Sequence, residues 1–187
     1  MFAKEGKAGR KKDYGEALKW FELAAEEGDG RALCEIGLLY KEGHGVDKST
    51  GKSLKYFREA AEKGDAKAQY ELGHRYDYGE GVKEDNKEAV KWYRKAAEQN
   101  VPQAQFSLGS AYFFGDGVEK DVVRGYAWQT IAVSGDYATP VDGAEAELHF
   151  ERWKTHHSKM TKEQIDEAKE LAKEMIAKNP KLIQRKK

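Results

Sequence analysis

A large aromatic residue recurs in this sequence at one fixed interval. Trp20, Tyr56, Trp92 and Trp128 each lie 36 residues from the next. The same interval relates Asp13, Ser49, Asp85 and Asp121, the glycines Gly37, Gly73 and Gly109, and the tyrosines Tyr40, Tyr76 and Tyr112. A period of this size is typical of repeats that stack side by side, not of a single closed globule. Because stacked repeats usually serve as binding surfaces, the period already favours a binding function.

The composition agrees with an elongated chain and argues against a nucleic-acid partner. The 187 residues suit one ordinary domain or a short stack of about four or five repeats. A mean hydropathy of -0.89 is more hydrophilic than a compact globule of this length should show, whereas a stack exposes more surface per residue. Lys plus Arg and Asp plus Glu both total 33, so the net charge is zero and no basic face for nucleic acid is predicted.

The cysteine count and the apolar runs exclude several further classes. Cys34 is the only cysteine, so no intrachain disulfide can form. We expect it to be a small buried apolar residue, with a reactive thiol as the alternative. No apolar run approaches the ~20 residues of a membrane span, so no membrane insertion is predicted. The N-terminal segment lacks the apolar core of a secretory signal, which predicts a cytoplasmic protein, or a periplasmic one whose leader was removed.

Each repeat begins with the signature of a helix N-terminus. Asp85 is followed three positions later by Glu88, as a capping box requires, and Asp13 with Glu16 repeats the arrangement. Ser49 and Asp121 keep only the capping residue. Apolar residues then follow at helical spacing: Ala17, Trp20, Ala24 and Ala25 in the first repeat, and Ala89, Trp92, Ala96 and Ala97 in the third. Gly28, Gly64 and Asn100 are expected to end these helices in the left-handed conformation.

A second, shorter helix is predicted in each repeat. Its apolar face reads Ala32, Ile36, Gly37 and Tyr40 in the first repeat. Glycine inside a helix costs up to about 1 kcal/mol relative to alanine, so its return at one position predicts a helix contact too close for a Cβ. The Gly-x-Gly-Val element that follows is predicted to be a turn, because a phosphate-binding loop needs a Lys-Ser/Thr ending or a preceding strand. Its valines, Val46, Val82 and Val118, are expected to insert between the repeats.

These residues resemble a known family. The order AQ-x-x-LG-x-x-Y-x-x-G-x-GV-x-x-D-x-x-x-A-x-x-W-Y-x-x-AA, which recurs over residues 13–133, is similar to the Sel1-like repeat, a relative of the tetratricopeptide repeat. The resemblance implies an all-α, right-handed αα superhelix, a solenoid of helix pairs with a concave binding face and a C-terminal capping helix. It implies no catalytic residues. Some secreted members are rich in paired cysteines, and this chain departs from them.

Three segments are predicted along the chain. Residues 1–12 read as a partial N-terminal repeat, with Gly9 in register with Gly81. Residues 13–153 form the solenoid, whose fourth unit decays into a loop over residues 134–143 and resumes as a helix over residues 144–154. Residues 154–187 form a capping helix and a basic tail. Thr161 with Gln164 predicts a capping box for that helix, Asn179 and Pro180 end it, and the tail is expected to be frayed.

Sites for metals, cofactors or catalysis are not predicted. His156 and His157 are adjacent and His149 is nearby, but zinc needs three or four converging ligands and adjacent residues rarely converge. His74 and Asp77 are the nearest candidate for an acid–base pair, which would suit a hydrolase acting on cell-wall material. They lie three residues apart on one helix face, where ordinary ion pairing is common. We therefore expect no enzyme activity and no cofactor.

The predicted binding residues lie on the second helices, which line the concave face in tetratricopeptide-like arrangements. They are the residues off the packed stripe: Leu38, Lys41, Tyr70, His74, Tyr78, Phe106, Ser110, Phe113 and Phe114. Aromatic residues in a concave groove are the usual anchors of a binding site. Tyr70 and Phe106 also suit packing between neighbouring repeats, whereas Phe113, Phe114 and Tyr78 are expected to be exposed.

The function predicted from the fold and the family is that of a protein–protein interaction adaptor. It would hold a peptide segment or a folded partner in its groove, with charged residues such as Lys41 setting the orientation, and we expect a monomer. A bacterial inhibitor or immunity-type protein that blocks an effector enzyme is a more particular version of the same function. A structural spacer is a further alternative, against which the groove aromatics count.

Overall fold

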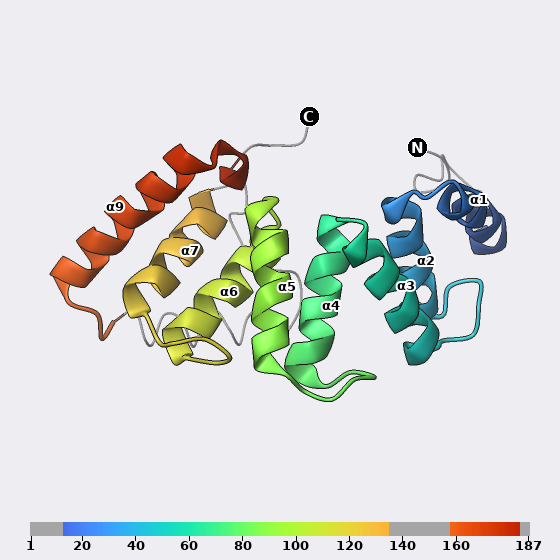
Figure 1. Ribbon diagram of the computed structural model, residues 1–187, viewed down its shortest axis with the longest axis horizontal. Helices are drawn as coiled ribbons and strands as arrows, with labels where there is room; N and C mark the ends of the chain where they lie inside the picture. The colour runs from blue at the N-terminus through green and yellow to red at the C-terminus, as the bar shows by residue number, and fades with distance from the viewer. Residues whose placement is uncertain (1–12, 135–157, 184–187) are drawn as a thin grey trace. The chain divides into compact units, whose positions relative to one another are not determined.

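The computed structural model describes residues 13–134 and 158–183, and their regular structure is all helical (Figure 1). The helices are α1 (Tyr14–Glu26), α2 (Gly30–Glu42), α3 (Thr50–Glu62), α4 (Ala66–Tyr78), α5 (Asn86–Glu98), α6 (Pro102–Phe114), α7 (Val122–Ser134) and α9 (Lys162–Lys178), followed by the 3-10 helix η1 (Pro180–Ile183). The chain divides into two compact units, residues 1–83 and 84–187, each of which is described by itself. Within each unit, consecutive helices pack against each other, as the predicted helix-pair stack requires.

The predicted capping residues begin the first helix of each repeat. The Asp13 carboxylate accepts a hydrogen bond from the Glu16 N–H at 3.0 Å, and Asp85 accepts one from Glu88 at the same distance. Ser49 and Asp121 cap α3 and α7 in the same way. At the start of α9, Thr161 and Gln164 form both bonds of the capping box. These side chains satisfy backbone N–H groups that have no partner inside the helix, which explains where each helix begins.

Residues in the left-handed conformation end the helices. Gly28, Gly64 and Asn100 have φ values of 88°, 89° and 61° after α1, α3 and α5. Both glycines of each Gly-x-Gly element also have positive φ, for example 74° at Gly43 and 72° at Gly45, so this element is a turn, as predicted. The three valines that follow these turns are half-buried.

The second helix of each pair is not shorter than the first, and this prediction was wrong. Helices α2, α4 and α6 have 13 residues each, as do α1, α3 and α5. For α2 and α4 the reason lies at their N-termini, where Asp29 and Asp65 cap the helix directly after the preceding turn, and α6 begins at Pro102. The helix therefore starts two residues before the apolar stripe that begins at Ala32.

Two recurring glycines let neighbouring helices approach closely. A Cβ built on Gly37 of α2 would lie 2.8 Å from the Phe57 ring of α3. In the second unit, a Cβ on Gly109 of α6 would lie 2.7 Å from Gln129 Cγ and 2.8 Å from the Gly125 carbonyl oxygen of α7. All three distances are shorter than a Cβ atom can tolerate without a shift of its neighbours. The predicted reason for a glycine inside each second helix is thereby confirmed at these two positions.

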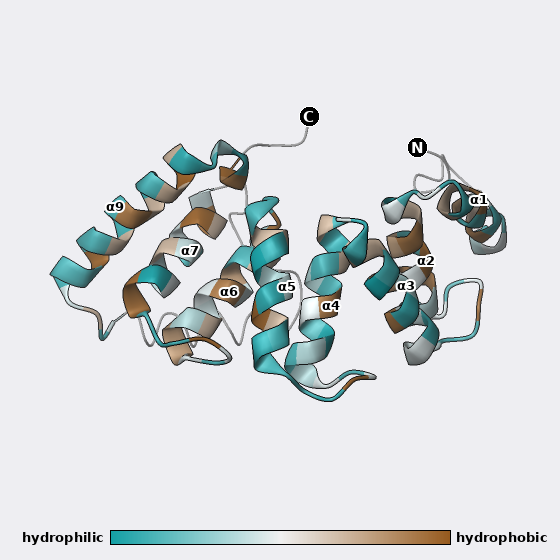
Figure 2. Cartoon of the chain, viewed as in Figure 1, coloured by the Kyte–Doolittle hydropathy of each residue, from teal (hydrophilic) through white to brown (hydrophobic). Residues whose placement is uncertain are grey.

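The C-terminal segment closes the second unit. Helix α9 packs on α7 through Ala168 and Ala172, and the apolar stripe of α9 stands out against its charged face in Figure 2. The backbone then continues into η1, whose Leu182 is buried and accepts a hydrogen bond from Gln105 Nε2 at 2.9 Å. The expectation of a frayed tail was therefore wrong as far as Ile183. The predicted loop and helix between residues 135 and 154, and residues 1–12, lie outside the described residues.

Candidate protein-binding surfaces

Three aromatic rings form a ladder along α4. Tyr70, His74 and Tyr78 are spaced by four residues and so lie on one face of the helix. The His74 and Tyr78 rings stack with centroids 4.5 Å apart, and the Tyr70 ring meets His74 edge-on at 6.3 Å. Tyr78 is 44% exposed, and the other two rings are half-buried. Such rings offer apolar area and polar edges at once, which suits contact with a peptide.

Two ion pairs join α2 to this face of α4. The Lys41 Nζ donates to Glu71 Oε2 at 2.9 Å, and Lys67 Nζ lies 3.5 Å from Glu35 Oε1. Leu38, which is half-buried on α2, occupies the repeat position that His74 occupies on α4. The five predicted residues of the first unit lie on α2 and α4, the two helices that these ion pairs join. We name this set, Leu38, Lys41, Tyr70, His74 and Tyr78, the α4 face.

A buried arginine, which the sequence pattern did not predict, lies behind the α4 face. Arg75 is only 2% exposed, and its Nη1 donates to Glu80 Oε2 at 2.7 Å. Its Nη2 donates to Ser53 Oγ at 3.0 Å, and Ser53 in turn donates to the Gly37 carbonyl at 2.8 Å. The guanidinium also lies 5.0 Å from the centroid of the Phe57 ring. These contacts tie α4 and its following turn to α2 and α3.

A signal for this residue was present in the repeat register. The position of Arg75 is held by Leu39 in the first repeat and by Ala111 in the third. A charged residue at a packed position is destabilising unless it is paired and hydrogen-bonded. The departure from the repeat pattern therefore pointed to a local polar network, which the structure shows.

The four predicted residues of the second unit lie on α6, and most of them are covered. Phe106 and Ser110 are buried, and Phe113 is only 7% exposed, so the predicted exposure of Phe113 was wrong. Phe114 is half-buried and meets the Phe113 ring edge-on at 5.5 Å. The burial of Phe106 agrees with its alternative assignment as a packing residue. Helix α7 passes close to α6 beside Phe113, because a Cβ on Gly125 would lie 3.0 Å from the Phe113 backbone nitrogen.

Cys34 has the properties of a packing residue. Its side chain is buried on α2. Burial raises the pKa of the Cys34 thiol far above its ordinary range, and the nearby Asp65 carboxylate raises it further by charge repulsion and a hydrogen bond. Since the thiolate is the nucleophilic form, this environment suppresses the reactivity of Cys34.

His74 is one half of the pair considered for catalysis. Its Nδ1 lies 4.0 Å from Glu80 Oε2.

Residues 13–134 and 158–183 contain neither a cluster of metal ligands nor a membrane-spanning helix. Within these ranges no three His, Cys, Asp or Glu side chains are placed to hold a metal ion. In the same part of the chain no helix has the length and apolar character needed to cross a membrane. The three histidines considered as metal ligands, His149, His156 and His157, fall outside the described residues.

The fold and these faces define a helical-repeat solenoid, and comparison with known proteins gives its family. The Sel1 repeat model matches residues 3–29, 30–65, 66–101 and 102–137. The chain therefore belongs to the Sel1 repeat family. Proteins of this family generally serve as scaffolds for protein interactions and are typically not enzymes. Comparison with curated proteins finds no match.

Two solved structures are similar to this chain. One is c5321, described as a protective antigen present in uropathogenic Escherichia coli strains that displays an SLR fold, with 34% identity and a TM-score of 0.79 over 95% of this chain. The chain spans 36% of the length of that protein. The other is a Sel1 repeat protein from Oxalobacter formigenes, with 31% identity and a TM-score of 0.62 over 79% of this chain and 67% of the other.

Proposed function

We propose that this chain is a protein-binding adaptor whose α4 face holds a peptide segment or an extended loop of a folded partner. The observation that carries the proposal is the Tyr70–His74–Tyr78 ladder, with its outer ring 44% exposed and stacked on its neighbour. Large, rigid rings supply contact area at a low cost in conformational entropy, which is why they recur as anchors in binding sites.

The ion pairs beside the ladder support the proposal. Lys41–Glu71 and Lys67–Glu35 connect α2 to α4, so the helix that carries all three rings is braced against its neighbour. Arg75 ties α4 to the turn that follows it through Glu80, two residues after Tyr78. A face held in this way needs little rearrangement when it binds, which favours affinity. The ligand expected from this chemistry carries an apolar or aromatic side chain beside a charged one.

A displayed peptide library provides the test. Peptides selected on the full chain should lose at least about tenfold in affinity for a Tyr78→Ala variant, because the most exposed aromatic anchor of the face is removed. Glu42→Ala is the matched control, since Glu42 is exposed and holds the same repeat position on α2. Circular dichroism checks that both variants keep their helix content. Selected peptides that bind the wild-type chain and Tyr78→Ala equally well would rule out the α4 face.

A further inference from the structure

The α4 face has an acidic group at its more exposed end. Glu80 lies in the turn that follows α4, two residues after Tyr78, and its side chain is 45% exposed. Its Oε2 is 4.0 Å from His74 Nδ1, and the His74 ring stacks on the Tyr78 ring. The carboxylate therefore lies beside the middle ring of the ladder, close to the ring that is most exposed.

Only one oxygen of this carboxylate is engaged. Glu80 Oε2 accepts the hydrogen bond from Arg75 Nη1 at 2.7 Å, and His74 is too far from the same oxygen for a hydrogen bond. Glu80 Oε1 has no hydrogen-bond or ion-pair partner within residues 13–134 and 158–183. By contrast, both oxygens of Glu71 lie within 3.3 Å of Lys41 Nζ. Glu80 thus keeps an oxygen that can accept from a further donor.

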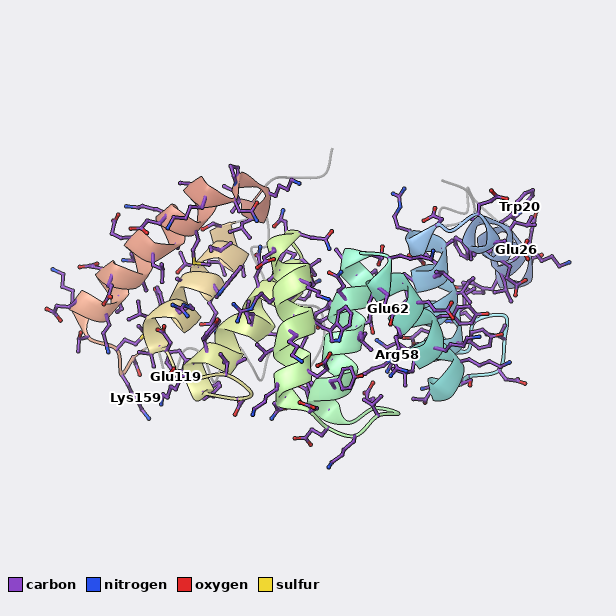
Figure 3. All side chains as sticks on the ribbon, in the orientation of Figure 1. Trp20, Glu26, Arg58, Glu62, Glu119 and Lys159 are labelled. Carbon is purple, nitrogen blue, oxygen red and sulfur yellow. The ribbon has the colours of Figure 1, made fainter. Side chains whose placement is uncertain are left out.

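The other described arginines of the first unit do not supply this donor. Arg31 is exposed on α2, and Arg58 is exposed on α3, where it is labelled in Figure 3. Neither of them forms an ion pair with Glu80. In the described part of this unit, the exposed side of the Glu80 carboxylate therefore has no cation of its own.

The buried arginine fixes this carboxylate in place, and the second repeat differs here from its neighbours. Arg75 is held by Ser53 and lies over the Phe57 ring while it donates to Glu80. The third repeat has Asp116 at the position of Glu80 but has no arginine on the preceding helix, and the first repeat has His44 there. A carboxylate that is already held loses little conformational freedom when it pairs with a ligand.

The end of α4 and the tyrosine ring favour a cation at the same place. Helix α4 ends at Tyr78, and the N–H groups of Gly79 and Glu80 both donate to the Arg75 carbonyl. A helix C-terminus carries a partial negative charge, which stabilises a nearby cation. The face of a tyrosine ring also attracts cations, and most often the guanidinium of arginine. The carboxylate, the ring and the helix end therefore favour one kind of ligand group.

We propose that the α4 face selects a partner segment that presents an arginine to Tyr78 and Glu80. The guanidinium stacks on the Tyr78 ring and donates to Glu80 Oε1. Arginine fits better than lysine, because a planar guanidinium can stack on a ring and donate hydrogen bonds in its own plane at the same time. Arg75 shows this combination on the buried side, 5.0 Å from the Phe57 ring centroid. The inference rests on the proposed binding at the α4 face and names the charged group of its ligand.

The displayed peptide library tests this inference when it is selected on variants of the full chain. Glu80→Gln removes the negative charge but keeps an oxygen that can accept from Arg75. Peptides selected on the wild-type chain should be enriched in arginine over lysine, and peptides selected on Glu80→Gln should not. Asp116→Asn is the matched control, because Asp116 is exposed and holds the same place in the third repeat. It should leave the enrichment unchanged.

One arginine-containing peptide from the wild-type selection then measures the coupling to Glu80. Its affinity for Glu80→Gln should be about two- to fivefold lower than for the wild-type chain, as expected for a partly exposed ion pair. Glutamine in place of the peptide's arginine should weaken binding to the wild-type chain about tenfold, because the stacking on the ring is lost as well. This second peptide should bind the wild-type chain and Glu80→Gln equally. Isothermal titration calorimetry measures the four affinities.

A second variant separates the loss of charge from a loss of stability. Glu80→Gln leaves the buried Arg75 with a neutral partner, which is destabilising. The double variant Arg75→Leu, Glu80→Gln removes both charges, and leucine is the residue that the first repeat has at the position of Arg75. It should show the same loss of arginine preference. Circular dichroism and urea denaturation check that both variants are folded.

The possible failures of the two proposals can be told apart. The arginine assignment is wrong if the arginine peptide binds the wild-type chain and both Glu80 variants equally while Tyr78→Ala still weakens it, and the proposed function then stands. A wild-type selection without arginine enrichment leads to the same conclusion. Peptides that are insensitive to Tyr78→Ala would overturn the proposed function, and this inference with it.

Discussion

Helices α1 and α7 hold the same place in their repeats, and their burial is opposite. Trp20 is 63% exposed, whereas Trp128 is 6% exposed, and Leu23 and Ile131, also equivalent in register, differ in the same direction. Helix α7 packs against both α6 and α9, whereas the main packing partner of α1 among the described helices is α2. A repeat position therefore does not fix the environment of its residue. The neighbouring helix decides whether an apolar side chain is core or binding surface.

The largest expected difference lies between Leu23 and Ile131. Ile131→Ala should lower the free energy of unfolding by about 2–5 kcal/mol, because it leaves a cavity in a packed region. Leu23→Ala should change it by less than about 0.5 kcal/mol, as is usual for exposed positions. Urea denaturation of both variants measures the two values. Equal losses of unfolding free energy in the two variants would show that Leu23 is as well packed as Ile131, and would contradict the difference between α1 and α7.

The glycine contacts allow a test of how closely α6 and α7 approach each other. Gly109→Ala should destabilise the protein by about 1–3 kcal/mol, because the new Cβ would meet Gln129 and the Gly125 carbonyl of α7. Gly51 of α3 has nothing within 4 Å of a built Cβ, so Gly51→Ala should stabilise the protein by up to about 1 kcal/mol through helix propensity. Thermal unfolding should therefore show a lower melting temperature for Gly109→Ala and a higher one for Gly51→Ala than for the wild-type chain. A neutral Gly109→Ala would contradict the close approach of α6 and α7.

The smallest effect concerns Cys34, which is buried on α2, the helix beside α1. Its pKa is raised in the folded state, so the unfolded thiol ionises first as the pH increases past about 8.5. The unfolded state then binds fewer protons, and the free energy of unfolding falls by up to about 1.4 kcal/mol per pH unit above that point. Urea denaturation between pH 7.5 and 9.5 measures the slope, and Cys34→Ala should flatten it. Identical slopes would show that the thiol is accessible to water.

Local structure followed closely from the sequence. The capping role of Asp13, Ser49 and Asp85 could be predicted because an N-cap depends only on a side chain and the backbone three residues on. The left-handed residues after the helices were equally local. The close approach at Gly37 was predictable because a glycine that recurs inside a helix needs a packing reason.

Burial was harder to predict, because it depends on neighbours that the repeat pattern does not contain. Phe113 and Tyr78 were given the same role, and the structure covers the first and leaves the second partly exposed. Leu182 was placed in a frayed tail, although it is buried within the second unit and its carbonyl accepts a hydrogen bond from Gln105, 77 residues away in sequence. Arg75 was overlooked because an average over repeats hides the single position that departs from it.

The difference between α1 and α7 depends above all on the exposure of Trp20, which can be measured directly. In the full-length chain labelled with 5-fluorotryptophan, a soluble gadolinium chelate should broaden the Trp20 resonance strongly and the Trp128 resonance little. Assignments come from the Trp20→Phe and Trp128→Phe variants. Equal broadening of the two resonances, or stronger broadening of Trp128, would contradict an exposed Trp20 and a buried Trp128.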